Sequence, residues 1–313
     1  MTKNLVPYFL IPICLGITFS RCDNKLETLE KSYYEFPLPN DSTVAFVYGS
    51  REFGWHIGIT FDHKTAYSLT SGPLETNVKW SPDKKWLVFT NSIEQNEQIW
   101  RIDYNGKNKN ALTSIHSYCN YPVISPDGQK IVFNCLIDSI EHIIITDTKG
   151  HDWQQVTDSN IMFNYKIGRF FRPDWSPDGM HILFNYNSSD WLKVGLGLLD
   201  LITREIIFLS RLDSLRPSYA HISSARDEIV FVGSGWPGVQ IFRANLDGSN
   251  IIQLTNSFMA SFPDWSSDGE RIAYVQWESL SDDASAIWIM NRDGTNKRKA
   301  IDLVGHLCSN PSW

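Results

Sequence analysis

A short sequence unit recurs five times along the chain, about 45 residues apart. Its fullest form is Trp-Ser-Pro-Asp-Gly, at residues 175–179. The five copies begin at Trp80, Ile124, Trp175, Ile222 and Trp265. A repeat of this length without helical periodicity is typical of the four-stranded blade of a β-propeller.

Each copy also keeps one internal register. Seven residues after the proline position stands an aromatic residue that ends a short apolar run: Phe89, Phe133, Phe184, Phe231 and Tyr274. Proline, aspartate and glycine in that order favour a tight turn, so each copy starts with a hairpin of constant length. Two further apolar runs follow each hairpin. The five copies therefore predict five complete blades.

The two ends of the chain together supply a sixth blade. Residues 44–70 contain three strand-like runs without a preceding first strand, and residues 310–313 read as a first strand with nothing after it. We expect the C-terminal strand to pair into the N-terminal blade, because closure covers an edge that is otherwise free to pair. The predicted fold is all-β, a six-bladed β-propeller of four-stranded antiparallel blades over residues 43–313.

The N-terminus resembles an export signal. Residues 1–21 join Lys3 to an apolar run that is short for a membrane span, and Cys22 follows. This order resembles a bacterial lipoprotein signal, with Cys22 as the lipidation site and residues 22–42 as a linker. Ordinary cleavage after Ser20 and an uncleaved anchor are the alternatives. The expected location is periplasmic or at the cell surface, with any membrane contact made through a lipid anchor.

The net charge and the cysteine content exclude further classes of partner and of site. The chain has 28 basic and 35 acidic residues and a net charge of −7, which disfavours nucleic acid as a partner. No cysteine spacing fits a zinc site. A bridge between Cys119 and Cys308 is not expected, because they lie in non-neighbouring repeats. Cys135 follows a strand-like run and is predicted to be a small buried apolar residue.

The repeated Pro-Asp-Trp-Ser-Pro-Asp-Gly string, at 173–179 and in altered form at 263–269, is similar to the repeat of TolB-type periplasmic propeller proteins. The resemblance covers residues 43–313. It implies the fold and an exported protein, without the α/β domain that precedes the propeller in TolB. The same repeat resembles the propellers of prolyl-peptidase-type enzymes and of some pectin-fragment lyases, and fold alone does not choose a function.

The chain shows no motif for catalysis. It lacks the GxSxG, HExxH and P-loop patterns, so no catalytic residue and no cofactor is assigned. His116, His221 and His306 fall where first strands begin, near the expected channel mouth. They are interpreted as ordinary loop histidines. The alternative is a lyase-like enzyme acting on an acidic glycan, with a metal at the channel mouth.

The connection at residues 158–172 is the longest between consecutive blades and carries basic and aromatic residues. We predict a binding loop here, since loops above a rigid scaffold often carry function. The candidate residues are Lys166, Arg169, Phe170, Phe171 and Arg172 in this loop, with Trp191 and Trp236 in turns of the same face. The expected partner of this monomeric module is an envelope protein, an acidic peptide or a carboxylated sugar. The alternative is a loop that packs over the channel mouth with Phe170 and Phe171. The repeated tryptophans, such as Trp175, are expected to pack between blades.

Overall fold

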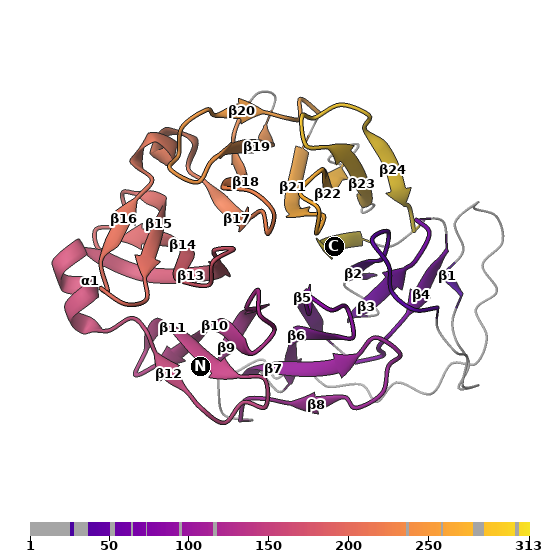
Figure 1. Cartoon of the computed structure of the whole chain (residues 1–313), viewed down its shortest axis with the longest axis horizontal. Coiled ribbons are helices and arrows are strands. Elements are labelled where there is room, and N and C mark those ends of the chain that lie inside the picture. Colours follow the sequence, from indigo (N-terminus) through magenta and orange to yellow (C-terminus); the bar gives the residue numbers. More distant parts are fainter. Residues whose placement is uncertain are drawn as a thin grey trace, which may run out of the picture.

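The structure is a computed structural model. It describes residues 26–27 and 37–313, apart from 51–53, 64, 73, 94–95, 115–117, 236–237, 258, 278–284 and 304–306. Within this part, six β-sheets stand around a central axis (Figure 1), which confirms the predicted six-bladed propeller. In the same part of the chain, no helix combines the length and the hydropathy needed to cross a membrane. Residues 1–21 and Cys22 lie outside the described residues.

Five blades are built of four antiparallel strands, and blade 1 carries an additional short outer strand. From the axis outward, blade 1 contains β25 (Leu307–Ser312), β2 (Val44–Ser50), β3 (Gly54–Thr60), β4 (Ala66–Ser68) and β1 (Leu26–Glu27). Blade 2 contains β5 (Glu75–Trp80), β6 (Trp86–Ile93), β7 (Asn96–Asp103) and β8 (Asn110–Ala111), and blade 3 contains β9 (Cys119–Ile124), β10 (Lys130–Ile137), β11 (Ile140–Asp147) and β12 (Gln154–Gln155).

The remaining blades follow in chain order. Blade 4 contains β13 (Ile167–Trp175), β14 (His181–Ser188), β15 (Val194–Asp200) and β16 (Ile206–Phe208), and blade 5 contains β17 (Ser218–Ile222), β18 (Glu228–Ser234), β19 (Val239–Asn245) and β20 (Ile252–Gln253). Blade 6 contains β21 (Met259–Trp265), β22 (Arg271–Trp277), β23 (Ser285–Asn291) and β24 (Arg298–Ile301). The helix α1 (Ser159–Tyr165) precedes blade 4, and the 3₁₀ helix η1 (Ser210–Leu215) precedes blade 5.

The repeated Ser-Pro-Asp-Gly unit forms the turn between the first and second strands of a blade. In blade 3, the Ser125 hydroxyl and the amide of Gln129 both donate to Asp127 Oδ1, and the amide of Lys130 donates to Ser125 Oγ at 2.9 Å. Gly128 takes the left-handed conformation, with φ of 71°. These donors favour the ionised carboxylate, so they hold the pKa of Asp127 below its ordinary value.

The aromatic residues of the second strands form the centre of each blade. Phe46 of β2 and its five counterparts in the repeats are completely buried: Phe89, Phe133, Phe184, Phe231 and Tyr274. In blades 2 to 6 they sit at one register because the preceding turn has a fixed length. The tryptophans that open the repeats are also buried. Trp175, for example, is 6% exposed and donates through Nε1 to the carbonyl of Val123 in the neighbouring blade. Packing between blades is therefore their role, as predicted.

Blade 1 closes the ring through the C-terminus. Strand β25 pairs antiparallel with β2, with Ser312 opposite Ala45. The amide of Trp313 donates to Asp264 in blade 6 at 3.2 Å, and Ser312 Oγ accepts from the amide of Trp80 in blade 2 at 3.2 Å. The last two residues therefore bind the two neighbouring blades, and the predicted closure is confirmed.

The prediction for Cys135 is wrong. Cys135 and Cys119 are opposite each other on β10 and β9 and form a disulfide, 16 residues apart in sequence. The sequence shows both cysteines, but the pairing depends on a register shift in this hairpin that the spacing alone does not reveal. Cys308 is a free, buried thiol, and burial raises its pKa to about 12.

Replacing Trp313 with alanine should lower the free energy of unfolding by about 3–5 kcal/mol, because it leaves a cavity at the closing strand. Denaturant titration of the full chain measures this change. Trp153, which is 42% exposed, provides the control: Trp153→Ala should lose less than half as much. Equal losses in the two variants would contradict the role of Trp313 in closure.

Removing the disulfide should also destabilise the chain. A disulfide that closes a loop of this size stabilises a fold by about 3 kcal/mol. The double variant Cys119→Ala/Cys135→Ala lacks the disulfide and should lose about this much free energy of unfolding. The urea midpoint should fall accordingly. Adding a reductant should lower the midpoint of the parent protein and leave that of the double variant unchanged, whereas a reductant-insensitive parent would argue against the bond.

Candidate functional site

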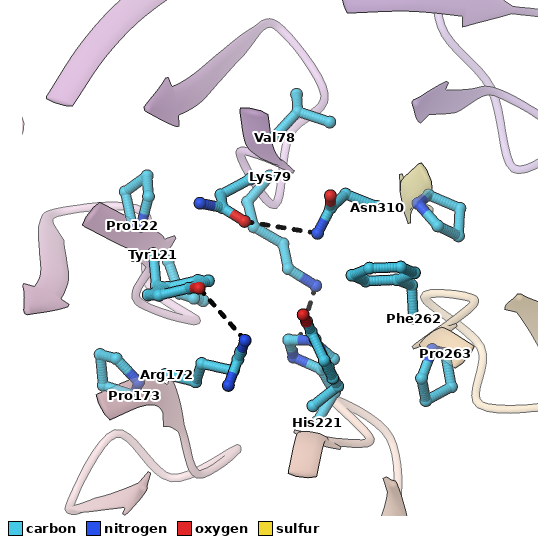
Figure 2. A pocket seen from close by; sticks show the side chains of 14 residues that line it. Val78, Lys79, Tyr121, Pro122, Arg172, Pro173, His221, Phe262, Pro263 and Asn310 are labelled. Carbon is cyan, nitrogen blue, oxygen red and sulfur yellow. Dashed lines mark hydrogen bonds between the residues drawn. The ribbon is translucent and has the colours of Figure 1, made fainter. Parts of the chain in front are cut away.

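The first strand of every blade lines the central channel, and all six carry a bulge at the same position. Three residues before the position of the repeated tryptophan, the backbone is left-handed, with φ between 44° and 54°, at Asn77, Tyr121, Arg172, Tyr219, Phe262 and Asn310. The pairing with the second strand shifts register at this point in all six blades. Such angles are uncommon outside glycine. The bulge directs these side chains toward the axis, where they line one pocket (Figure 2).

Arg172 is the charged member of this ring. Its guanidinium carbon lies 3.8 Å from the ring centre of Tyr219 and 4.7 Å from that of Tyr121. Its Nη2 donates to the Tyr121 hydroxyl at 3.2 Å (Figure 2). Phe262 packs edge-on against Tyr219, with ring centres 4.4 Å apart. An arginine held on aromatic faces in this way has a fixed position and keeps its charge.

The charge of Arg172 is not neutralised by a neighbour. Among the residues that the structure describes, no carboxylate lies within 4 Å of its guanidinium, and its Nε is buried without a hydrogen-bond partner. Burial raises the pKa of Tyr121, so the phenol beside it stays neutral. The space between the ring side chains is about 40 Å³. The site therefore offers one unpaired cation in a narrow aromatic constriction.

A polar cluster lies next to this constriction, two residues further along the first strands. Lys79 Nζ is 2.8 Å from Asp264 Oδ1 and 3.4 Å from His221 Nδ1. The same His221 nitrogen is 3.2 Å from Asp174 Oδ2, which also accepts from the amide of Ile222. Lys79 and Asp264 form an ion pair, whereas His221 Nδ1 either accepts from Lys79 or donates to Asp174, depending on its tautomer. The four side chains therefore form a connected polar cluster in the channel.

A second and larger cavity opens at the other end of the channel, on the side of the Ser-Pro-Asp-Gly turns. It has a volume of about 380 Å³ and is lined by the buried tryptophans, by turn prolines and by the Lys79–Asp264 pair. Both carboxylates at its base, Asp174 and Asp264, already accept bonds from neighbouring blades.

The segment predicted as a loop at residues 158–172 is ordered as α1 and the first part of β13. Asp158 caps the helix by accepting from the amide of Ile161, and Lys166 ends it in a left-handed conformation. The sequence prediction missed the helix because seven residues give too little periodicity to recognise. The basic residues of this segment consequently lie at different depths of the blade.

The predicted site residues of this segment are therefore not all brought together. Phe170 is completely buried and packs on Phe184, 5.3 Å away, so it belongs to the core between blades 3 and 4. Arg169 is paired with Glu141 through two hydrogen bonds. Lys166 is exposed beyond the helix. Phe171 lies beside Arg172, 5.4 Å from its guanidinium, and of the five only Arg172 reaches the channel.

Trp191 stands out in the turn between β14 and β15. This turn repeats the hydrogen bonds of the Ser-Pro-Asp-Gly unit, with the amide of Leu192 donating to Asp190 at 3.0 Å and that of Lys193 donating to Ser188 at 3.0 Å. Trp191 occupies the glycine position, with φ of 61°, and is 61% exposed. A bulky residue in this conformation is strained. Trp236 lies outside the described residues.

Of the three histidines considered for a metal, only His221 is described, and it faces the channel; His116 and His306 are outside the described residues. No group of three metal-ligating side chains occurs in the described part of the chain. Sequence analysis missed Tyr121, Tyr219 and Lys79. The signal was present, because each lies at a fixed offset from a repeat start, but the repeat does not show which offset faces the axis.

Replacing Trp191 with glycine should raise the free energy of unfolding by about 1 kcal/mol, because glycine adopts the left-handed conformation without a steric penalty. Trp191→Ala removes the same indole but keeps the Cβ, so it should be less stable than Trp191→Gly by a similar amount. Thermal unfolding of both variants measures the difference. A glycine variant no more stable than the alanine variant would contradict the strain.

Sequence comparison gives two matches. The family described as TolB beta propeller domain matches residues 39–205. A relative, Uncharacterized protein Atu1656 of Agrobacterium fabrum, is 27% identical over 211 residues, which cover 63% of this chain and 68% of the relative.

Two solved structures share the fold. TolB from Acinetobacter baumannii superposes with a TM-score of 0.73 at 17% identity and covers 88% of this chain and 68% of that one. The putative TolB from Agrobacterium tumefaciens gives a TM-score of 0.66 at 20% identity, covering 84% of this chain and 89% of that one. These structures show the same fold. The family match covers more than half of this chain, and it shows that the chain belongs to the TolB beta-propeller family.

Proposed function

We propose that this propeller is an exported binding protein of the cell envelope that takes an acidic peptide segment of a partner protein into the mouth of its central channel. Arg172 carries this proposal. It is a cation without a described carboxylate partner, held between two aromatic rings in the small pocket of the channel. Arginine in an aromatic setting is a common anchor of protein interfaces.

The size of the constriction favours a peptide over a carboxylated sugar. About 40 Å³ is available between the ring side chains. A water molecule needs on the order of 10–15 Å³ of such space, so the constriction accepts a group the size of a carboxylate and not a sugar ring. A glutamate or aspartate side chain, or a C-terminal carboxylate, can reach Arg172 while the rest of the peptide stays at the mouth.

We expect the propeller to act as a monomer.

Two features support export. The apolar N-terminal run followed by Cys22 has the order of a lipoprotein signal. The disulfide between Cys119 and Cys135 is of the kind that persists in an oxidising compartment such as the periplasm. We propose that Cys22 is acylated and that a lipid anchor holds the protein at the membrane.

The lyase-like alternative, with a metal at the channel mouth, has less support. A bound cation would need the oxygen and nitrogen donors that face the channel. The Lys79 ammonium already contacts both Asp264 and His221, and its own positive charge repels a metal ion placed among them. The donors present in the described part of the channel therefore fit a metal poorly.

Selection of peptides from a displayed random library tests the binding role. Peptides enriched on the full-length protein should carry an acidic residue or a free C-terminal carboxylate. Their affinity should fall at least tenfold in Arg172→Gln, about 1.4 kcal/mol or more, because a charge-assisted hydrogen bond is lost. Affinity should also fall with added salt.

Arg169→Gln is the matched control for Arg172→Gln. It removes the same charge from the same strand, but Arg169 is already paired with Glu141 and does not line the channel pocket. Its affinity for the selected peptides should stay close to that of the parent. Peptides without acidic groups, or equal affinities for the parent and Arg172→Gln, would overturn the proposal.

A further inference from the structure

Asn134 on β10 is a buried asparagine, 2% exposed, and its side chain bonds to the backbone of the next blade. Its Nδ2 donates to the carbonyl of Phe170 at 3.1 Å, and its Oδ1 accepts from the amide of Arg172 at 2.9 Å. Because a carbonyl only accepts and a backbone amide only donates, these partners also determine which end of the side chain is the oxygen. Asn134 therefore holds β13 on both sides of Phe171, where the bulge of blade 4 begins.

The fold does not need an asparagine at this position. In every blade, the equivalent residue of the second strand follows the buried aromatic residue and pairs with the residue before the left-handed one. The other five equivalents are Val47, Thr90, Asn185, Val232 and Val275. The blades that follow the three valines still form the bulge, with φ between 44° and 52° at Asn77, Phe262 and Asn310. The two bonds of Asn134 are therefore not required to form a bulge.

Blade 3 also holds the other end of Arg172. The Arg172 Nη2 donates to the hydroxyl of Tyr121, which stands on β9, at 3.2 Å. The disulfide between Cys119 and Cys135 joins β9 to β10, two residues before Tyr121 in one strand and next to Asn134 in the other. The backbone amide and the guanidinium of Arg172 are thus bound to two strands that a covalent bond connects.

Asn185, at the equivalent position of blade 4, makes only one of these two bonds. Its Nδ2 donates to the carbonyl of Pro217, two residues before Tyr219, at 2.9 Å. Its Oδ1 is buried without a hydrogen-bond partner. Among the described residues, both bonds are therefore made only at the bulge that carries the cation.

We propose that Asn134 is a positioning residue, which keeps the Arg172 guanidinium on the aromatic rings of the channel pocket. An arginine side chain has many rotamers, and ordering them during binding lowers the affinity. Because Asn134 holds the backbone of Arg172 in place, fewer of these rotamers have to be ordered when a ligand arrives. The inference rests on the proposed function, since the placement of Arg172 acts through its affinity for an acidic peptide.

NMR spectroscopy of the free full-length protein, with arginine labelled with ¹⁵N, tests the placement of Arg172. The guanidinium carbon lies 3.8 Å from the ring centre of Tyr219, so the ring current should shift the Nε–H proton of Arg172 upfield. Its loss in Arg172→Gln identifies this resonance. In Asn134→Val, the resonance should move towards that of an exposed arginine, because the backbone of Arg172 is no longer bound to blade 3.

Peptide affinity measures the consequence of this placement. The acidic peptides selected on the parent should bind Asn134→Val about fivefold more weakly, the order of one lost hydrogen bond. The loss should be smaller than in Arg172→Gln, because the cation is still present.

Two further variants make the test specific. Thr90→Val is the matched control, because it removes the buried polar group at the equivalent position of blade 2 and should change neither the resonance nor the affinity. Asn134→Ala removes the same amide without adding a branched side chain, and it replaces Asn134→Val if the valine variant does not fold.

Two outcomes would overturn the positioning role of Asn134. The first is an Arg172 resonance that stays in place in the Asn134 variants. The second is a resonance that moves while the affinity for acidic peptides remains that of the parent. A parent that binds no acidic peptide would instead overturn the function proposed for Arg172, and the resonance would still decide whether Asn134 places this side chain.

Discussion

Everything in this fold depends on closing the ring with the last strand of the chain. Each blade buries its apolar faces only against its two neighbours, so an open ring would expose two blade faces and a strand edge. Strand β25 removes both, and Trp313 binds blade 6 while Ser312 binds blade 2. Because the ring is closed, the six inner strands hold fixed positions around the axis, and side chains from distant parts of the sequence meet there.

The architecture could be predicted because it is repeated. Five copies of one turn and of one aromatic position determine the hairpin register, and the incomplete units at the two ends account for the sixth blade. The aromatic residue seven residues after each turn-proline position, such as Phe133 or Phe184, is completely buried, as a fixed register requires. In each copy the turn residues and the buried positions indicate the same structure. Such agreement allows the fold to be predicted from the sequence.

The candidate site was harder to predict, for two physical reasons. The bulge in each first strand shifts the register by one residue, so the simple alternation of a strand does not identify which side chains face the axis. Arg172 was recognised for its charge and its neighbours, but Tyr121 and Tyr219 carry no such mark in the sequence. Lys166 follows the short helix α1 and is exposed, and Arg169 on β13 pairs with Glu141, so neither joins Arg172 in the channel. The disulfide was missed for the same reason, since the bulge in β9 sets Cys119 opposite Cys135.

The six left-handed bulges have a consequence for how new specificity can arise on this scaffold. Asparagine, tyrosine, arginine and phenylalanine all adopt a φ between 44° and 54° at these positions, so this conformation does not depend on the side chain. Exchanging one of them alters the lining of the channel at one point of the circle and leaves the blade behind it unchanged. The six bulge positions can therefore change independently of the strands that carry them. Related chains can bind different ligands while they keep the same strands.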